Sequence, residues 1–373
     1  MKIAFVHPAL MDYRLELFNN LNKLYDLTFI FTRQGRGQDD VKEKHLKIPK
    51  HWDYKIVRSD KLMVRGRSFH MFLKLMRELL KRKYDIILTS TSWYICFPIA
   101  KITGKKFILL TEYWHFVSNS LLKRLSNLLI KFIAKHADAI ITTGTKAYEA
   151  HLNFNVKKEK IFKCIQCAVD YSDIPTIDLR KELGLKGKKI ILYLSRIVPH
   201  KGLDYLIKAF SLLEKEANIA LLIVGEGPFR KECEDLIKEL GIKNAFFMGG
   251  VFDDILKASY YKVCDVFVLP AVFLNSLYEP WGLVINEALA FGKPVITTDA
   301  VGAAYDLVRD DYNGYVVKNR DIEELYEALY KILLNPDLAK RMGENSRKIF
   351  EEKNNYEKML DAFVSAINYV QQK

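Results

Sequence analysis

The sequence predicts an α/β protein built from two doubly wound halves, in each of which helices cover both faces of a parallel sheet. Its length of 373 residues suits two domains of roughly 100–200 residues each. Short β-branched runs alternate with amphipathic stretches along the whole chain, an order typical of parallel sheets. The alternation pauses at a polar segment, residues 170–175, and then begins again. We therefore predict a first domain over residues 1–169, a second over 170–352, and a final helix in 353–373 that crosses back to the first.

The first half is predicted to contain short buried strands separated by helices. The strand segments are rich in Ile, Leu, Phe and Thr, whereas the helical segments repeat apolar residues every three or four positions. We expect strands at residues 2–6, 27–32, 85–89, 107–111 and 139–143, and helices at 13–25, 69–83 and 121–136. Residues 33–67 are basic and loosely patterned, so we expect an irregular excursion there, either a solvated face or a surface for an anionic partner.

The second half repeats the same alternation. We expect strands at residues 189–194, 220–224, 245–248, 266–269 and 295–297, and helices at 203–215, 229–240, 283–291, 322–334, 336–353 and 356–372. Loops that follow parallel strands gather at the carboxyl edge of the sheet. We therefore expect the binding residues on these loops, in a deep cleft between the two halves.

The composition and charge exclude some classes of protein and favour an anionic partner. Half of the residues are hydrophobic and 12% are aromatic, which excludes a disordered or fibrous chain. Residues 1–165 carry 31 Lys and Arg against 14 Asp and Glu, so the formal net charge of +13 lies entirely in the first half. Nucleic acid, an acidic membrane or a phosphorylated small molecule would each fit this charge. The sequence contains no recognition-helix, zinc-finger or RNA-binding signature, so we expect no nucleic acid.

The cysteines and the amino terminus point to a cytoplasmic protein. The five cysteines are scattered and odd in number, as expected of reduced thiols. Cys164 and Cys167 have the spacing of half a zinc site, but no second pair accompanies them, so we expect no metal. No signal peptide is expected, because the first residues lead directly into a strand. The weakly polar run 86–100 is too short to span a bilayer.

The strongest candidate site is the sequence EPWGLVINEA, which places Glu279 and Glu287 eight positions apart. Glu279 follows a predicted strand, and Gly282 opens a helix. The first-turn amides of such a helix, at Gly282, Leu283 and Val284, can bind an anion such as a diphosphate. The two carboxylates would then suit a ligand with hydroxyl groups on both sides of that diphosphate. The alternative is a surface loop beside a helix with a salt-bridged glutamate.

A second candidate follows the first strand of the second half, in the sequence SRIVPHKG. Arg196 offers a planar fork of donors and Lys201 a point charge, and both suit phosphate oxygens. Gly225 and Gly227 follow the next strand but lack the third glycine of a dinucleotide-binding fingerprint, so they are a weak signal by themselves.

These motifs resemble the nucleotide-sugar domain of the family 4 retaining glycosyltransferases, which have the GT-B fold of two Rossmann-like domains. The resemblance spans most of residues 189–317. It implies that Arg196 and Lys201 hold the diphosphate of the donor and that Glu287 binds its ribose. It also implies that Glu279 binds hydroxyl groups of the transferred sugar. Val251 and Phe252 would frame the base, mostly through their backbone.

The first half is less similar to this family. The loop after the first strand reads HPALMDYR, where many members have a glycine pair. It is similar instead to a subgroup with a Tyr-Arg pair, often found in polysaccharide and glycolipid assembly. Arg14 would then meet an acceptor phosphate, unless it is a plain helix-start arginine. After the fourth strand, Glu112 and then His115 are the candidates for a contact near the sugar or acceptor, although a lone histidine is more often structural.

The resemblance predicts an enzyme that moves a sugar from a UDP- or GDP-linked donor to an acceptor hydroxyl, with retention at the anomeric carbon. We expect no cofactor and no metal, because no Asp-x-Asp triplet occurs and the protein's own cations would replace a divalent ion. The alternatives are a sugar-nucleotide epimerase on the same fold and a basic nucleic-acid-binding protein.

The basic first half would bind the acceptor. Residues 69–83 and 121–135 combine apolar and cationic side chains, which suits an anionic bilayer surface as well as packing on the sheet. We therefore expect peripheral attachment at the inner face of the membrane and a lipid-linked or polysaccharide glycan as acceptor.

Overall fold

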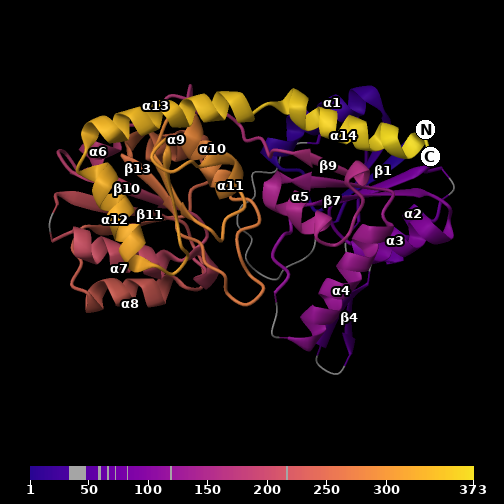
Figure 1. The fold of residues 1–373 in the computed structure, drawn as a ribbon, viewed down its shortest axis with the longest axis horizontal. Coiled ribbons are helices and arrows are strands. Elements are labelled where there is room, and N and C mark those ends of the chain that lie inside the picture. The colour runs from indigo at the N-terminus through magenta and orange to yellow at the C-terminus, as the bar shows by residue number, and fades with distance from the viewer. Residues whose placement is uncertain are drawn as a thin grey trace. The chain divides into compact units, whose positions relative to one another are not determined.

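The computed structural model divides the chain into two compact units (Figure 1). Unit 1 contains Met1–Trp114, Asn119–Cys164 and Tyr356–Lys373, and unit 2 contains His115–Ser118 and Ile165–Asn355. The structure describes residues 1–32, 48–57, 60–64, 67–71, 73–81, 83–117, 120–215 and 217–373, with backbone alone for 60–64 and 67–71. The predicted cleft between the two halves stays a prediction.

Unit 1 is built on a seven-stranded parallel sheet in the order β3-β2-β1-β6-β7-β8-β9. Its strands are β1 (Lys2–His7), β2 (Asp26–Phe31), β3 (Asp53–Ile56), β6 (Ile86–Thr89), β7 (Lys106–Thr111), β8 (Ala139–Thr143) and β9 (Ile161–Cys164). Strand β1 lies inside the sheet and is buried from Ile3 onward. It has a neighbouring strand along each edge, and Ile3 lies opposite Leu27 of β2 and Ile86 of β6. The continuous apolar runs of these strands therefore reflect burial on both faces.

Six α-helices accompany the described part of this sheet. They are α1 (Asp12–Leu24), α2 (Leu73–Leu79), α3 (Trp93–Ile102), α4 (Leu121–His136), α5 (Gly144–Leu152) and α14 (Tyr356–Gln371). The last of these comes from the end of the chain and lies against α1 (Figure 1). The hydroxyl of Tyr356 donates to the carbonyl of Tyr13 at 3.1 Å, and the ring of Phe363 lies 6.3 Å from that of Phe5. The carboxyl-terminal helix is thus part of the core of unit 1.

Two predictions about the basic part of unit 1 are wrong. The helix predicted over 69–83 is shortened to α2, because residues 67–71 form strand β5 (Arg67–Met71), which pairs antiparallel with β4 (Asp60–Val64). Pairing with a neighbouring segment here overrides the helical spacing of the apolar residues. The excursion predicted over 33–67 contains β3 and β4 rather than irregular chain alone, and its residues 33–47, 58–59 and 65–66 lie outside the described residues.

Unit 2 is built on a six-stranded parallel sheet in the order β12-β11-β10-β13-β14-β15. Its strands are β10 (Lys189–Leu194), β11 (Ile219–Val224), β12 (Ala245–Gly249), β13 (Val266–Leu269), β14 (Val295–Thr298) and β15 (Gly314–Val317). Its α-helices are α6 (Leu179–Glu182), α7 (Leu203–Leu213), α8 (Arg230–Glu239), α9 (Asp254–Val263), α10 (Leu283–Ala290), α11 (Ala304–Leu307), α12 (Ile322–Leu333) and α13 (Pro336–Lys353).

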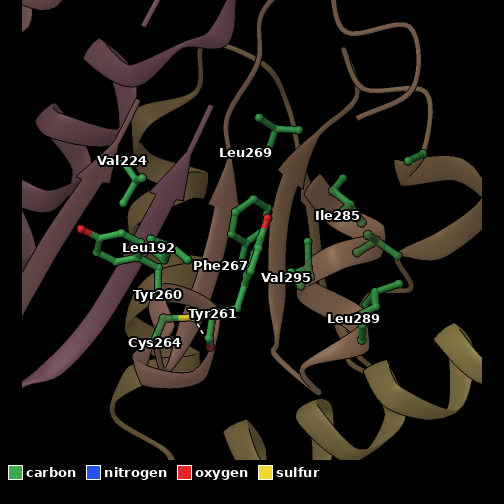
Figure 2. Packing of buried hydrophobic residues seen from close by; sticks show 14 of the residues in the cluster. Leu192, Val224, Tyr260, Tyr261, Cys264, Phe267, Leu269, Ile285, Leu289 and Val295 are labelled. Carbon is green, nitrogen blue, oxygen red and sulfur yellow. Dashed lines mark hydrogen bonds between the residues drawn. The ribbon is translucent and has the colours of Figure 1, made fainter. Parts of the chain in front are cut away.

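The core of unit 2 has two layers because successive residues of a strand point to opposite faces. Leu192 of β10 and Phe267 of β13 face a layer that also contains residues of α9, α10 and α13. Ile191 and Val268 face the other layer, with residues of α7 and α12. Figure 2 shows the first layer, in which Phe267 and Tyr261 lie between the strands and the helices. Each unit is therefore a sheet with helices on both faces, which confirms the predicted fold class.

The strand orders determine where the loops of each unit meet. In unit 1 the order reverses between β1 and β6, and in unit 2 it reverses between β10 and β13. At such a point the loops leave the sheet in opposite directions, which opens a crevice at the carboxyl edge. In the described part of the chain, no helix combines the length and the apolar character needed to cross a bilayer.

Candidate functional site

The switch point of unit 2 brings together the loops that carry Lys201 and Glu279. The loop after β10 contains a 3-10 turn, Pro199–Lys201, which ends at Gly202 with a φ of 69°. A Cβ atom at Gly202 would lie 1.9 Å from the carbonyl oxygen of Pro270, the residue that follows β13. Only glycine permits this close approach, so the two loops are packed backbone to backbone beside Lys201.

Lys201 and Glu279 form an ion pair in this structure. Their side chains are only 11% and 14% exposed, so the pair is largely shielded from water. The backbone of Glu279 is fixed on both sides, because its amide donates to Ala300 at 3.2 Å and its carbonyl accepts from Gly302 at 3.0 Å. The structure thus holds two predicted site residues in contact on a rigid frame.

Arg196 lies on the same loop but faces outward. Its side chain is exposed, whereas its carbonyl accepts a hydrogen bond from the hydroxyl of Tyr193 at 3.1 Å. The next residue, Ile197, donates its amide to Glu226 at 2.9 Å. The guanidinium is therefore accessible to solvent on a loop whose backbone is held by hydrogen bonds. Burial, followed by the charges of Lys201 and Arg196, lowers the pKa of the neighbouring His200 to about 4.

Two glycines after β11, Gly225 and Gly227, allow this loop to pack against the loop after β10. A Cβ at Gly225 would lie 1.9 Å from the carbonyl oxygen of Ser195, and one at Gly227 would lie 2.1 Å from that of Ile197. The Gly-Glu-Gly sequence therefore lets the loops after β10 and β11 touch. This close approach fixes the backbone on both sides of Arg196.

Helix α10 begins at this edge of the sheet with its amides unpaired within the helix. Gly282 precedes it with a φ of 98°, and Leu283 and Val284 form its first turn, where no earlier helical carbonyl is available. Trp281 anchors this start, since its indole Nε1 donates to Asn286 Oδ1 at 2.9 Å. The predicted anion-binding amides thus lie directly after the Glu279 loop.

Glu287 is held by two residues that sequence reasoning missed. Its carboxylate accepts from Lys257 Nζ at 3.0 Å and from the Tyr261 hydroxyl at 2.7 Å, and its side chain is 10% exposed. Burial, together with the charge of Glu287, raises the pKa of Tyr261 well above its usual value. Lys257 also lies 3.9 Å from the centre of the Tyr171 ring. Residues 254–263 were not predicted as a helix, so the inward position of Lys257 was not predicted either.

The residues predicted to frame the base follow β12. Val251 is half-buried against the core, whereas Phe252 is 49% exposed. A Cβ at Gly250 would lie 3.3 Å from the Phe252 ring, and the carbonyl of Gly249 accepts from the Gly225 amide at 2.8 Å. The base-framing loop therefore adjoins the loop after β11.

The predicted acceptor-side residues divide between the units. Arg14 and Glu112 belong to unit 1, and His115 belongs to unit 2. Arg14 is buried in the first turn of α1, and Glu112 is half-buried after β7. The His115 ring stacks 4.2 Å from the ring of Phe273, and burial lowers its pKa. The structure therefore does not gather these three residues within one unit.

The cysteines and the acidic residues do not assemble into a metal centre in the part of the chain that the structure describes. No group of three or more His, Cys, Asp and Glu side chains there could hold an ion. Cys164 and Cys167 are free and buried, and burial raises the pKa of the Cys164 thiol to about 11. These thiols therefore pack as small apolar groups.

The geometry at the carboxyl edge of unit 2 agrees with a comparison against protein families. Residues 176–349 match the model of the family described as glycosyl transferases group 1. This match covers most of unit 2 and less than half of the chain. Lys201, Glu279, Glu287 and the start of α10 all lie within the matched residues.

Individual relatives are similar over about half of the chain. An uncharacterized glycosyltransferase of Methanocaldococcus jannaschii is 32% identical over 48% of this chain and 44% of its own length. A GDP-mannose-dependent alpha-(1-6)-phosphatidylinositol monomannoside mannosyltransferase of Mycobacterium tuberculosis is 33% identical over 46% of this chain and 45% of its own. Both alignments span less than half of the relative.

The whole fold is similar to that of a solved structure. HepE of Anabaena, in complex with UDP, superposes with a TM-score of 0.77 at 19% identity, over 99% of this chain and all of that one. Further structures of HepE contain UDP and glucose, or UDP-glucose. This likeness extends beyond residues 176–349 to both units and shows that the chain has the GT-B fold.

Proposed function

We propose that this protein is a retaining family 4 glycosyltransferase that moves a sugar from a UDP- or GDP-linked donor to an acceptor hydroxyl. The observation that carries the proposal is the buried Lys201–Glu279 pair beside the first turn of α10. A nucleoside-diphosphate sugar needs cationic donors for its diphosphate and a carboxylate for its sugar hydroxyls, and this pair offers both. The UDP complexes of HepE and the GDP-mannose named for the mycobacterial relative support this class of donor.

Binding of the donor would exchange the partners of this ion pair. Lys201 would turn to the diphosphate and Glu279 to hydroxyl groups of the sugar, so neither charge is left buried without a partner. Arg196, on its fixed loop, would add a planar fork of donors from the solvent side. Glu287, oriented by Lys257 and Tyr261, would accept hydrogen bonds from the ribose.

The reaction would place new negative charge where these cations lie. The bond between the anomeric carbon and the diphosphate oxygen breaks, and its electron pair leaves with the diphosphate. The acceptor oxygen bonds to the same face of that carbon, and its proton passes to the departing diphosphate oxygen. Arg196, Lys201 and the amides of α10 stabilise the departing diphosphate more than the bound donor, which lowers the barrier. The protein's own cations would thus do the work of a divalent ion.

This function is tested by incubating the protein with radiolabelled UDP- and GDP-sugars, with EDTA or with manganese. We expect slow hydrolysis of one donor, unchanged by EDTA, with the released sugar initially in the donor's anomeric configuration. An inverted product or an absolute requirement for manganese would contradict the proposal. Accumulation of an epimerised sugar nucleotide would instead identify an epimerase.

We further propose that α4 attaches the protein to an anionic membrane surface, where a lipid-linked acceptor is available. The helix buries one face through Ile130, Ile133 and Ala134. A second apolar face, roughly opposite, has side chains between 45% and 76% exposed. It consists of Leu121, Leu122, Leu125, Leu128, Leu129 and Phe132.

The positive charge on α4 favours an anionic lipid surface over another protein chain as the partner of its exposed apolar face. The helix contains no Asp or Glu, and Arg124, Lys131 and Lys135 are exposed along one edge of the apolar face. Each basic residue near an anionic bilayer contributes about 1 kcal/mol to binding. A second copy of this face would bring like charges together, whereas anionic headgroups would neutralise them.

Sedimentation with vesicles tests this attachment. We expect wild type to bind phosphatidylglycerol vesicles at low salt and to bind phosphatidylcholine vesicles weakly. The double variant Leu125→Gln/Leu128→Gln should lose most of this binding and keep its melting temperature. The control Leu212→Gln/Leu240→Gln changes two exposed leucines of unit 2 and should bind normally. Equal binding by both variants would refute a role for α4.

A further inference from the structure

Glu287 accepts hydrogen bonds from two side chains of α9, and these bonds reach different oxygens of its carboxylate. Lys257 Nζ donates to Oε1 at 3.0 Å, and the Tyr261 hydroxyl donates to Oε2 at 2.7 Å. A carboxylate offers about four acceptor positions, shared between its two oxygens. The two bonds therefore leave one open position on each oxygen. A pair of open acceptors on one carboxylate matches the two hydroxyl donors of a vicinal diol, such as the diol of ribose.

Tyr261 is a rigid donor to this carboxylate. Its side chain is completely buried, and it lies in the core layer between the strands and the helices (Figure 2). Its ring stacks on that of Phe291, with centres 5.4 Å apart and planes 19° apart. Burial, followed by the charge of Glu287, raises the pKa of Tyr261 well above its usual value. The hydroxyl therefore keeps its proton at neutral pH and stays a donor.

Lys257 is held from two sides. Its side chain is 16% exposed and forms an ion pair with Glu287, whose side chain is 10% exposed. Its ammonium also lies 3.9 Å from the centre of the Tyr171 ring, and Tyr171 is itself buried. The face of an aromatic ring attracts a cation, so the ammonium has a second attachment besides the carboxylate. Lys257 can thus stay in place when Glu287 gains a ligand.

We propose that Lys257 and Tyr261 are positioning residues that hold the Glu287 carboxylate in one orientation and thereby give the donor site its preference for ribose over 2′-deoxyribose. This inference rests on the proposed transferase function, in which Glu287 binds the ribose, and it names the groups that set the sugar selectivity of that site. Without either donor, the carboxylate would rotate about its last side-chain bond. Its open acceptor positions would then no longer face both hydroxyl groups, and binding would have to order them first.

Calorimetric titration of the full chain with UDP, GDP and their 2′-deoxy forms tests this role. Wild type should bind one ribonucleotide about tenfold more tightly than its 2′-deoxy form, because the deoxy form lacks a hydrogen bond to a charged group. Lys257→Met keeps an unbranched side chain and removes its charge. It should bind the ribonucleotide about tenfold more weakly and the 2′-deoxynucleotide nearly as tightly as wild type does. General damage to unit 2 would instead weaken both ligands by the same factor.

Three further variants make the measurement specific. Lys257→Arg should restore most of the ribose preference, because a guanidinium is charged, donates hydrogen bonds and stacks on an aromatic ring. Lys262→Met changes an exposed lysine of the same helix and should leave both affinities unchanged. Tyr261→Phe removes only the hydroxyl and should lose part of the preference, and it decides the question if Lys257→Met does not fold. A ribose preference that is unchanged in the folded variants of Lys257 and Tyr261 would overturn the proposal.

Steady-state hydrolysis of the sugar nucleotide separates this positioning role from the chemical step. The ribose lies away from the bond that breaks, so Lys257→Met should raise KM about tenfold and leave kcat within about twofold of wild type. A fall in kcat at unchanged KM would contradict the inference. If neither UDP nor GDP binds to wild type, the proposed function fails together with this inference. If one of them binds and Lys257→Met weakens its ribose and deoxyribose forms equally, only this inference fails.

Discussion

The two units have similar sheet topologies, but they differ in whether the charged side chains at the carboxyl edges of their sheets form ion pairs. In unit 2, Lys201 pairs with Glu279, and Lys257 pairs with Glu287. In unit 1, the corresponding edge contains Arg14, which has no ion pair among the described residues. Both sheets reverse their strand order at this position. The difference therefore comes from the side chains that each crevice carries.

This contrast indicates two ways of preparing a site for an anion. Paired charges keep an empty site stable, and binding then exchanges one partner for another at small net cost. An unpaired buried cation leaves the empty site under-satisfied, so its ligand contributes stability as well as charge. Unit 2 contains charges of the first kind, and unit 1 contains Arg14, whose Nε and Nη1 atoms are of the second kind.

The largest effect in this comparison of paired and unpaired charges is expected from a substitution of Lys201. Lys201→Ala removes the cation proposed to stabilise the leaving diphosphate and leaves the largely shielded Glu279 without its partner. We expect turnover of the donor to fall about 10²–10³-fold. Lys231→Ala, which breaks an exposed pair with Asp235 in the same unit, is the matched control and should be active. Near-normal turnover in Lys201→Ala would refute the assigned role.

The rigidity of the unit 2 edge is tested at its glycines. Gly202→Ala would place a Cβ 1.9 Å from Pro270 O, whereas Gly187→Ala meets nothing within 4 Å. Both residues have positive φ, which costs alanine about 1–2 kcal/mol. The control should show only this loss, and Gly202→Ala should lose roughly 3 kcal/mol or more. Equal losses in urea unfolding would show that the two loops separate freely.

His7, one of the buried histidines of unit 1, gives the smallest expected effect, a loss of stability at acidic pH. The pKa of His7 is lowered to about 3, so on acidification the unfolded chain takes up a proton before the folded one does. The contribution of His7 is complete above pH 6.5 and is lost as the pH falls, at about 1.4 kcal/mol per unit. We expect a loss of about 2 kcal/mol by pH 5. His7→Gln should lack this loss, whereas the exposed control His136→Gln should keep it.

Much of the fold could be predicted from the sequence, because its strands are buried on both faces. The ranges predicted for β8, β10, β13, α4 and α13 match the structure residue for residue. Continuous apolar runs and long amphipathic repeats give strong local signals. The β4–β5 pair was missed because pairing between neighbouring segments gives only a weak local signal, and helix α9 was also missed.

The residues of the candidate site could be predicted only where they belong to a recognisable sequence motif. Lys201 and Glu279 were expected to serve one ligand, and the structure brings them into contact. The partners of Glu287 were not predictable, since Lys257 and Tyr261 lie 30 and 26 positions away in sequence. Their approach depends on how α9 packs against α10, which no local pattern encodes.

The sequence by itself determined the two parallel sheets, the donor motif and the concentration of positive charge in the first half. Only the tertiary structure decided which charges are paired, which face of α4 is left uncovered, and that Nε and Nη1 of Arg14 are buried without hydrogen-bond partners. The physical reason is that secondary structure follows from the periodicity of neighbouring residues. Pairing and burial are set by residues that are distant in the chain and meet only after it has folded.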